Sequence, residues 1–137
     1  MPANDAKSFA LQIKQEWADK VEDLEEATAL IGLTAFRGVV QKSPVDSGRF
    51  RGNWNASIGE PNFTTTETVD PSGSATISAA TTTLGAYDAT DGFPAINISN
   101  GLPYGPRLED GYSGQAPNGM VALTITEIEA QFDGMEV

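Results

Sequence analysis

The sequence predicts an α+β domain with a long N-terminal helix, a small, mainly antiparallel sheet, a short middle helix and a C-terminal helix. Three observations predict this fold class. A chain of 137 residues has room for one core. Apolar residues recur at helical spacing before Pro44, and alternating, strand-like runs appear only after it. We therefore treat 1–137 as a single domain, with a helix over 1–42 and an α+β body over 43–137.

The first helix is predicted over 6–41, where apolar residues recur in steps of three and four that are broken only around Ala27 and Thr28. These residues are Phe9, Ile13, Trp17, Val21, Leu24, Ile31, Ala35 and Val39. Asn4 or Asp5 can cap the start, and Pro44 ends the helix because a proline ring disfavours helical geometry at the preceding residue. The opposite face is acidic and is predicted to be solvated. Its carboxylates include Glu22, Asp23, Glu25 and Glu26.

A tight turn is predicted at Asp46 and Gly48, since the carboxylate can accept a backbone hydrogen bond and the glycine tolerates positive φ. Arg49 and Arg51 follow. In an extended segment their guanidinium groups lie on one face and the Phe50 ring on the other. Two interpretations are open. The arginines bind a carboxylate partner, or they form a surface salt bridge within the domain, worth ~0–1 kcal/mol.

The remaining elements follow from periodicity and composition. Alternating apolar residues predict strands over 54–58 and 93–99, and a Thr-rich run predicts an edge strand over 63–69. Apolar residues at helical spacing predict a short helix over 74–87. A closing helix is predicted over 120–132, although the first half of this segment also fits a strand.

The segment 97–120 leads into the closing helix and is rich in Gly, Pro and Asn. It contains too many Tyr, Leu and Met residues to be a plain flexible linker. Structureless loops longer than ~12–15 residues inside a compact domain are uncommon and usually functional. We therefore expect a loop of fixed shape that is both a connection and a contact surface.

Two absent residue types restrict the chemistry. The chain has no Cys and no His, so thiolate nucleophiles, a serine triad and the commonest metal ligands are missing. We assign no catalytic residue, cofactor or metal and do not expect an enzyme.

The net charge of −11 argues against a nucleic-acid-binding surface. No apolar run reaches the ~18 residues of a membrane span. No signal-peptide pattern follows Met1, so we expect synthesis in the cytoplasm without membrane contact.

Two motifs resemble the tail-component, or tail-completion, family of long-tailed bacteriophages. The first is Ser43-Pro-Val-Asp-Ser-Gly-Arg-Phe-Arg-Gly-Asn-Trp54. The second comprises Ile98-Ser-Asn-Gly-Leu-Pro-Tyr104, Leu108-Glu-Asp-Gly111 and Ser113-Gly-Gln-Ala-Pro-Asn-Gly-Met120. The resemblance runs from about Ala35 to the C-terminus, except for the middle segment 60–91. The family more often has Thr, Leu and Ala at the positions of Ser47, Phe50 and Gly105.

The resemblance implies a structural virion protein of the neck, made in the host cytoplasm. The resemblance also implies a ring, most often sixfold in proteins of this type, that completes the tail and joins it to the head. The implied partners are further copies of the chain and adjacent neck and tail proteins: a connector or stopper, and a tail terminator or tail tube. The genome passes through the channel without sequence-specific binding. The candidate interface residues are Asp46, Arg49, Phe50, Arg51, Trp54, Asn100, Pro103, Tyr104, Arg107, Glu109, Gln115, Pro117 and Met120.

Two other classes of function remain open. The first is an acidic, phage-encoded inhibitor that mimics DNA and blocks a nucleic-acid enzyme, with carboxylates in regular surface rows on a monomer or dimer. The second is a carboxylate-dependent enzyme, which requires a pocket with two facing acids of perturbed pKa. The assembly mass and the presence of the protein in virions distinguish these classes from a neck protein.

Overall fold

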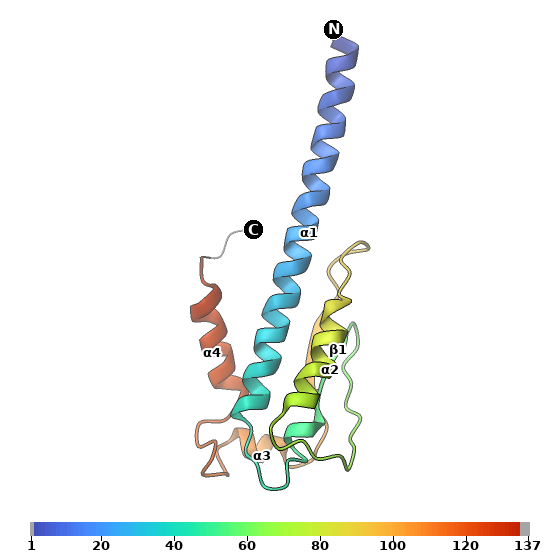
Figure 1. Cartoon of the computed structure of the whole chain (residues 1–137). Coiled ribbons are helices and arrows are strands. Elements are labelled where there is room, and N and C mark those ends of the chain that lie inside the picture. The colour runs from blue at the N-terminus through green and yellow to red at the C-terminus, as the bar shows by residue number, and fades with distance from the viewer. Residues whose placement is uncertain (1, 135–137) are drawn as a thin grey trace.

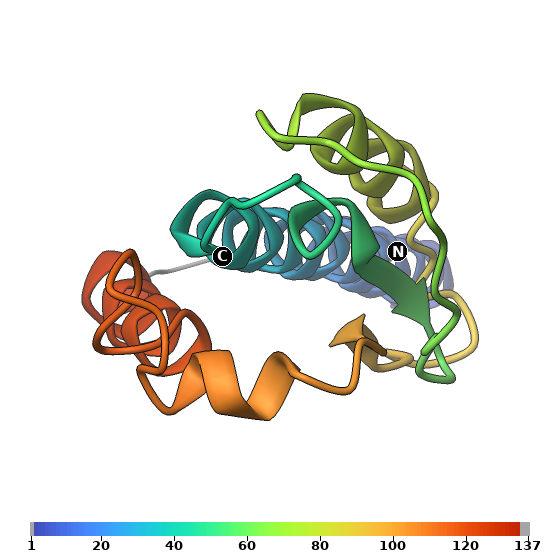
Figure 2. The same cartoon turned by 90° about the horizontal axis from the view of Figure 1, so that it is seen from below.

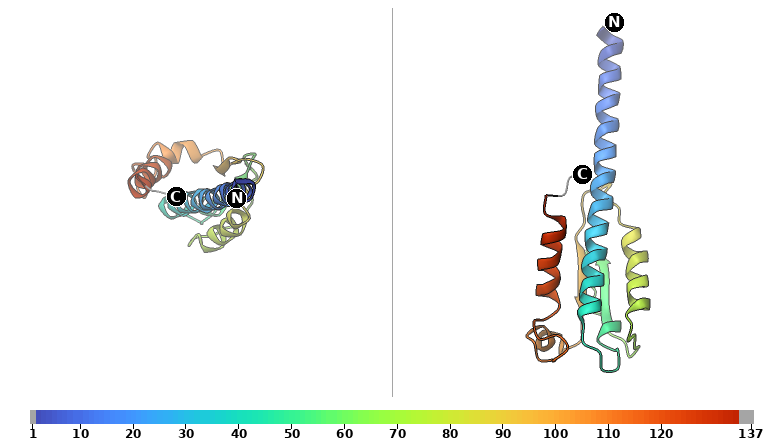
Figure 3. Two further views of the ribbon diagram at one scale, coloured as in Figure 1. Left: turned by 90° about the horizontal axis from the view of Figure 1, so that it is seen from above. Right: turned by 60° about the vertical axis from the view of Figure 1, so that its left-hand side comes forward.

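The computed structural model describes residues 2–134, with side chains for residues 6–134. It has the predicted α+β class: a long N-terminal helix, a two-stranded antiparallel sheet and shorter helices, one of them C-terminal (Figure 1). The long helix α1 (Pro2–Lys42) is the axis of the molecule. The helices α4 (Val121–Phe132) and α2 (Ser74–Gly85) lie along different sides of its lower half, as Figures 1 and 3 both show.

The two halves of α1 lie in different surroundings. Phe36, Val39 and Val40 are buried in the lower half, whereas every residue from 6 to 20 is exposed. At 1.5 Å per residue, this exposed stretch projects about 22 Å beyond the body. We call residues 6–20 the arm. The helix prediction is therefore confirmed, but the apolar face that predicted it packs against the body only in its lower half.

The sheet consists of β1 (Trp54–Ile58) and β2 (Ile96–Asn100), which pair antiparallel with Trp54 opposite Asn100. The first strand has its predicted bounds, and the second begins three residues later than predicted and ends one residue later. The predicted middle helix is also present and ends at Gly85. The sheet lies between the middle helix and the segment that leads to α4. Seen from below, the chain wraps round one side of α1 from α4 to the sheet, with α2 on the other side (Figure 2).

The edge strand predicted over Phe63–Val69 is wrong, because this segment forms no strand. Side-chain amides take the place of a backbone ladder. Asn53 donates to the Thr66 carbonyl and accepts from the Thr66 N–H, at 3.1 and 2.7 Å. Asn55 donates to the carbonyls of residues 62 and 64. The Asn53 and Asn55 side chains thus hold this Thr-rich segment as an extended coil, and it does not pair as a third strand.

The extended geometry predicted for Arg49 to Arg51 is also wrong. Phe50 has φ −63° and ψ −48°, and the short 3₁₀ helix η1 (Arg51–Asn53) follows it. The Asn53 amide donates to the Arg49 carbonyl at 2.7 Å and closes this turn. Gly48 has the predicted positive φ, 93°, and an added Cβ would lie 2.5 Å from the Pro71 nitrogen. The hydroxyl of Ser47, and not the predicted carboxylate of Asp46, accepts the backbone hydrogen bond at this turn, from the Arg49 N–H at 3.2 Å.

The core joins the lower half of α1 to both motif segments. It contains Phe36, Val39, Val40, Phe50, Trp54, Ala80, Leu102, Ala116 and Met120. Three of these residues, Leu102, Ala116 and Met120, come from the Gly- and Pro-rich segment 97–120. That segment also contains a short helix missed by sequence reasoning, α3 (Gly105–Glu109). A loop that buries three side chains and forms a helix has a fixed shape, as predicted.

The C-terminal end of α1 is held by Arg51. Its guanidinium group donates to the carbonyls of Gln41 and Ser43, at 3.0 and 2.9 Å, and to the Pro71 carbonyl at 2.8 Å. The last carbonyls of a helix lack partners within the helix and carry partial negative charge, so a cation is favourable there. One side chain thus joins the end of α1, the turn that follows it and the segment that leads into α2.

We predict that Arg51→Lys lowers the free energy of unfolding by about 1–3 kcal/mol, because a point charge on a flexible stem cannot reproduce the bonds of the guanidinium fork. Urea unfolding followed by circular dichroism measures the change. The matched control is Arg37→Lys on the exposed side of α1, which should change stability by less than about 0.5 kcal/mol. Equal stabilities of the two variants would contradict this role of Arg51.

Candidate interface at the loop end

The two motif segments meet at the end of the molecule opposite the arm, at the bottom of Figure 1. Gln115 joins them. Its side chain accepts a hydrogen bond from the Val45 N–H and donates one to the Val45 carbonyl, both at 2.9 Å. This paired contact resembles one step of a β-ladder between segments that lie 70 residues apart in the chain. The loops therefore form one surface and do not move as separate flaps.

A groove of about 480 Å³ lies between the two segments, and we call it the loop groove. It is lined by Pro44, Val45, Asp46, Ser47, Gly48, Arg49, Phe50, Tyr104, Leu108, Tyr112, Ser113 and Gln115. Aromatic rings connect it to the core. The Phe50 ring lies 5.7 Å from that of buried Trp54 and 5.8 Å from that of exposed Tyr104. The wall of the groove is thus fixed by core packing.

The rim of the loop groove presents an exposed aromatic and cationic pair. The Arg107 guanidinium carbon lies 4.9 Å from the centre of the Tyr112 ring, within the range of a cation–π contact. The Tyr112 side chain is 72% exposed. Tyr and Arg are the residue types that most often dominate binding energy at interfaces. Sequence reasoning missed Tyr112 and Leu108, although both lie inside the loop that it singled out.

The predicted arginine pair does not act as a pair. Arg49 makes an ion pair with Glu67 at 3.2 Å and donates to the Thr66 carbonyl, so it fits the interpretation of a salt bridge within the domain. Arg51 instead binds the backbone carbonyls at the end of α1. Sequence spacing could not separate these outcomes, because they depend on a turn that the spacing does not specify.

Glu109 caps α4. Its carboxylate accepts hydrogen bonds from the backbone N–H groups of Met120, Val121 and Ala122, at 2.8–3.0 Å. Burial by itself would raise the pKa of Glu109, but the three N–H donors stabilise the charged form more and lower the pKa below its ordinary value of 4.5. The capping residue comes from α3 and not from the residues next to the helix, so the local sequence gives no signal for it.

The candidate interface residues divide into three groups. Those on the surface are Asp46, Pro103, Tyr104, Arg107, Gln115 and Pro117. Those half-buried and bonded within the chain are Arg49, Arg51, Asn100 and Glu109. Phe50, Trp54 and Met120 are core residues less than 8% exposed, so their side chains support the surface and do not form it.

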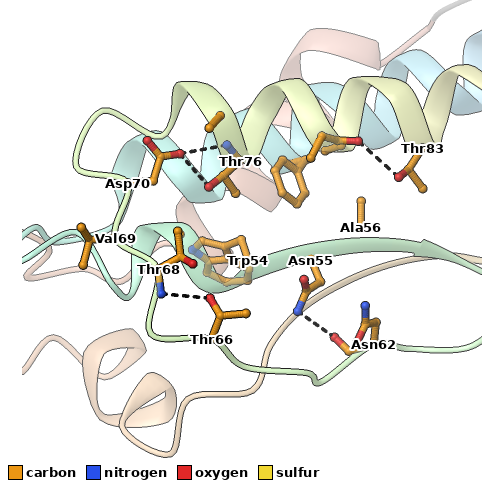
Figure 4. A pocket seen from close by; sticks show the side chains of 15 residues that line it. Trp54, Asn55, Ala56, Asn62, Thr66, Thr68, Val69, Asp70, Thr76 and Thr83 are labelled. Carbon is orange, nitrogen blue, oxygen red and sulfur yellow. Dashed lines mark hydrogen bonds between the residues drawn. The ribbon is translucent and has the colours of Figure 1, made fainter.

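A second hollow, of about 420 Å³, lies between α2, β1 and the segment 62–70 (Figure 4). Asp70 is the only acid among its lining residues, and its carboxylate accepts hydrogen bonds from the Thr76 N–H and hydroxyl at 2.8 and 2.7 Å. Burial opposes ionisation, but these bonds outweigh it and lower the pKa of Asp70. The hollow thus lacks the two facing acids that the enzyme interpretation requires.

Comparisons with known proteins add no relative: no family model, curated protein or solved structure matches the chain. The described residues contain no group of three His, Cys, Asp or Glu side chains placed to hold a metal ion. Within the same residues, no helix is long and apolar enough to cross a membrane. The strongest candidate site on the described surface is therefore the loop groove with its Arg107–Tyr112 rim.

We predict that the Glu109 cap makes stability depend on pH. Because the folded-state pKa is lowered, its contribution is complete above the unfolded value of about 4.5 and is lost as pH falls through the folded value. Glu109→Gln should lower the free energy of unfolding by about 1 kcal/mol at neutral pH. The stability of this variant should then fall less than that of the wild type as the pH is lowered. Thermal unfolding from pH 7 to pH 3 measures both. The control is Glu60→Gln, an exposed acid after β1, and an identical pH profile for the two variants would contradict the cap.

Proposed function

We propose that this chain is a structural subunit of the neck of a long-tailed bacteriophage. It forms a ring, with six subunits the expected number, that completes the tail and joins it to the head while the genome passes through its channel. The observation that carries the proposal is the loop groove. The two segments that resemble the family are distant in sequence, yet they meet in a single surface pinned by Gln115.

The arrangement of exposed surfaces is compatible with a ring. Closed rings are built from heterologous contacts, in which one patch of a subunit meets a different patch of the next. The chain has different surfaces at its two ends. The loop groove lies at one end, and the arm projects from the body at the other, as Figure 3 shows. The arm is available for contacts between copies, and the loop end for an adjacent neck or tail protein.

The loop end is suited to a protein partner. Interfaces are enriched in Tyr, Trp and Arg around a depression that excludes water. Here Tyr104 and Tyr112 line the groove, and Arg107 stacks on the Tyr112 ring. The groove walls are held by the Phe50–Trp54 ring contact and by the Gln115 hydrogen bonds. A prearranged surface loses little conformational entropy on binding, which favours a permanent contact in a particle.

We predict that Arg107→Ala combined with Tyr112→Ala abolishes head–tail joining and leaves the domain folded. Loss of two exposed interface side chains should weaken the contact by about 2 kcal/mol or more. A phage that lacks the gene is complemented with each variant, and joined particles are counted by electron microscopy. The matched control is Phe93→Ala, an exposed aromatic between α2 and β2.

We expect separate heads and tails with the double variant. We expect complete particles with the control. Complete particles with the double variant would show that the rim is not a contact surface. Complete particles without any copy of the gene would overturn the proposed function itself.

One observation favours the DNA-mimic alternative. Five exposed carboxylates lie along one side of α1, at Glu16, Asp19, Glu22, Asp23 and Glu26. Glu25, predicted to be solvated with them, is half-buried and accepts a hydrogen bond from the Ala89 N–H at 2.9 Å. Successive acids three or four residues apart are spaced about 5 Å along a helix. A regular acidic row is the feature that this alternative requires. It predicts a monomer or dimer that inhibits a DNA-binding enzyme, and it predicts no ring and no incorporation into particles.

In the ring we expect the acidic excess to face the channel, so that a polyanionic genome finds no site of adhesion. The acidic row on α1 is the leading source, followed by Asp88 and Asp91 in the loop after α2. The measurement is a titration of assembled rings with duplex DNA at low salt. We predict no measurable binding. Tight binding that weakens steeply with added salt would mean that lysine and arginine side chains line the channel instead.

A further inference from the structure

The arm carries an apolar stripe that its own subunit does not cover. Phe9, Ile13 and Trp17 are spaced four residues apart and therefore lie on one side of the helix, and all are 49–71% exposed. Monomeric proteins rarely leave large apolar residues in contiguous patches without a binding role. The arm therefore has the composition of a contact surface.

The stripe continues a face of α1 that already binds a helix. Trp17, Leu24, Ile31 and Gly38 are seven residues apart and share one side of α1. At Gly38 this side meets α4, since an added Cβ would lie 2.7 Å from the Thr124 side chain. The burial decreases upward: Leu24 and Ile31 are half-buried, and Trp17 is exposed. This face of α1 therefore continues into the arm, beyond the part that packs against α4.

The outer side of α4 is a second apolar surface. Val121 and Ile125 are four residues apart and share this side, at 37% and 51% exposure, and exposed Ala122 lies beside them. Between Val121 and Phe132 the charged residues are both acids, Glu127 and Glu129. Glu127 makes an ion pair with Lys42 of its own chain at 2.7 Å, which leaves Glu129 as the acid placed toward a partner.

We propose that the arm of one subunit packs against the outer side of α4 of a second copy. This inference deepens the proposed function, on which it rests, by naming the two faces that build the ring. Contact between two different faces is heterologous and continues from subunit to subunit until the ring closes. The residues placed at the contact are Phe9, Ile13 and Trp17 on the arm, and Val121 and Ile125 on α4.

Length and charge favour this occupant. The arm projects about 22 Å and α4 is about 18 Å long, so the two helices match along their axes. The outer part of the arm, residues 6–15, carries Lys7 and Lys14 and no acid. The opposing helix carries Glu129 and no base.

Cysteine crosslinking tests the contact without background, because the chain contains no Cys. Ile13→Cys and Ile125→Cys are prepared as separate variants, mixed and oxidised. We expect a crosslinked dimer in the mixture and none in either variant alone. A double variant should give a ladder of oligomers that ends at the ring. The control mixes Gln15→Cys, on the opposite side of the arm, with Ile125→Cys and should crosslink far less.

Three results would overturn the inference: dimers from Ile13→Cys alone, which indicate arm-to-arm packing; equal crosslinking in the control; or a mixture that stays monomeric at the highest soluble concentration. Trp17→Ala should weaken the association of subunits by about thirtyfold or more, as expected when the indole side chain is a hot spot of the contact. Lys14→Glu should weaken it by roughly twofold to fivefold, and Glu129→Lys in the partner should restore it.

The two proposals fail differently. Rings seen by electron microscopy without crosslinks between residues 13 and 125 would reject the arm contact and leave the neck function standing. Specific crosslinks in a protein that is absent from virions would keep the arm contact and reject the neck function.

Discussion

The fold depends on how the C-terminal end of α1 is held. Arg51 donates to carbonyls at the end of the helix and to the carbonyl of Pro71, so one cation fixes the chain on both sides of the first turn. Buried Ser43 reinforces this point, since its hydroxyl donates to the Val39 carbonyl and accepts from the Trp54 indole N–H at 2.7 Å. This anchor adds to the core packing that places β1 and α2 against the long helix.

A fixed end has consequences for both surfaces of the molecule. At the loop end, the turn that Arg51 holds leads directly to Val45, which is bonded to Gln115. The loop groove is therefore connected to the end of α1 through a short, bonded segment. At the other end, rigid attachment of a continuous helix projects the arm at a set angle from the body (Figure 1). A small domain thereby presents two oriented surfaces, which we propose as the contacts of a repeated assembly.

Sequence patterns predicted the elements better than their environments. Helical periodicity located all of α1, but it could not show that Trp17 lies beyond the reach of the body, because exposed and buried apolar stripes have the same spacing. A helix of more than 25 residues in so small a domain was the available signal. The segment Phe63–Val69 was misread because two asparagine side chains bind it, and β-propensity is insensitive to such contacts. The caps made by Arg51 and Glu109 are long-range and have no local pattern.

The central claim is that identical subunits form a ring in the particle neck, and cryo-electron microscopy of purified virions tests it most directly. The account predicts a ring of copies of this chain between head and tail, expected to be sixfold, with the loop groove against a neighbouring protein and the arm against α4 of the next subunit. A reconstruction in which no density at the neck fits the α1 arm and the body of this fold would contradict it.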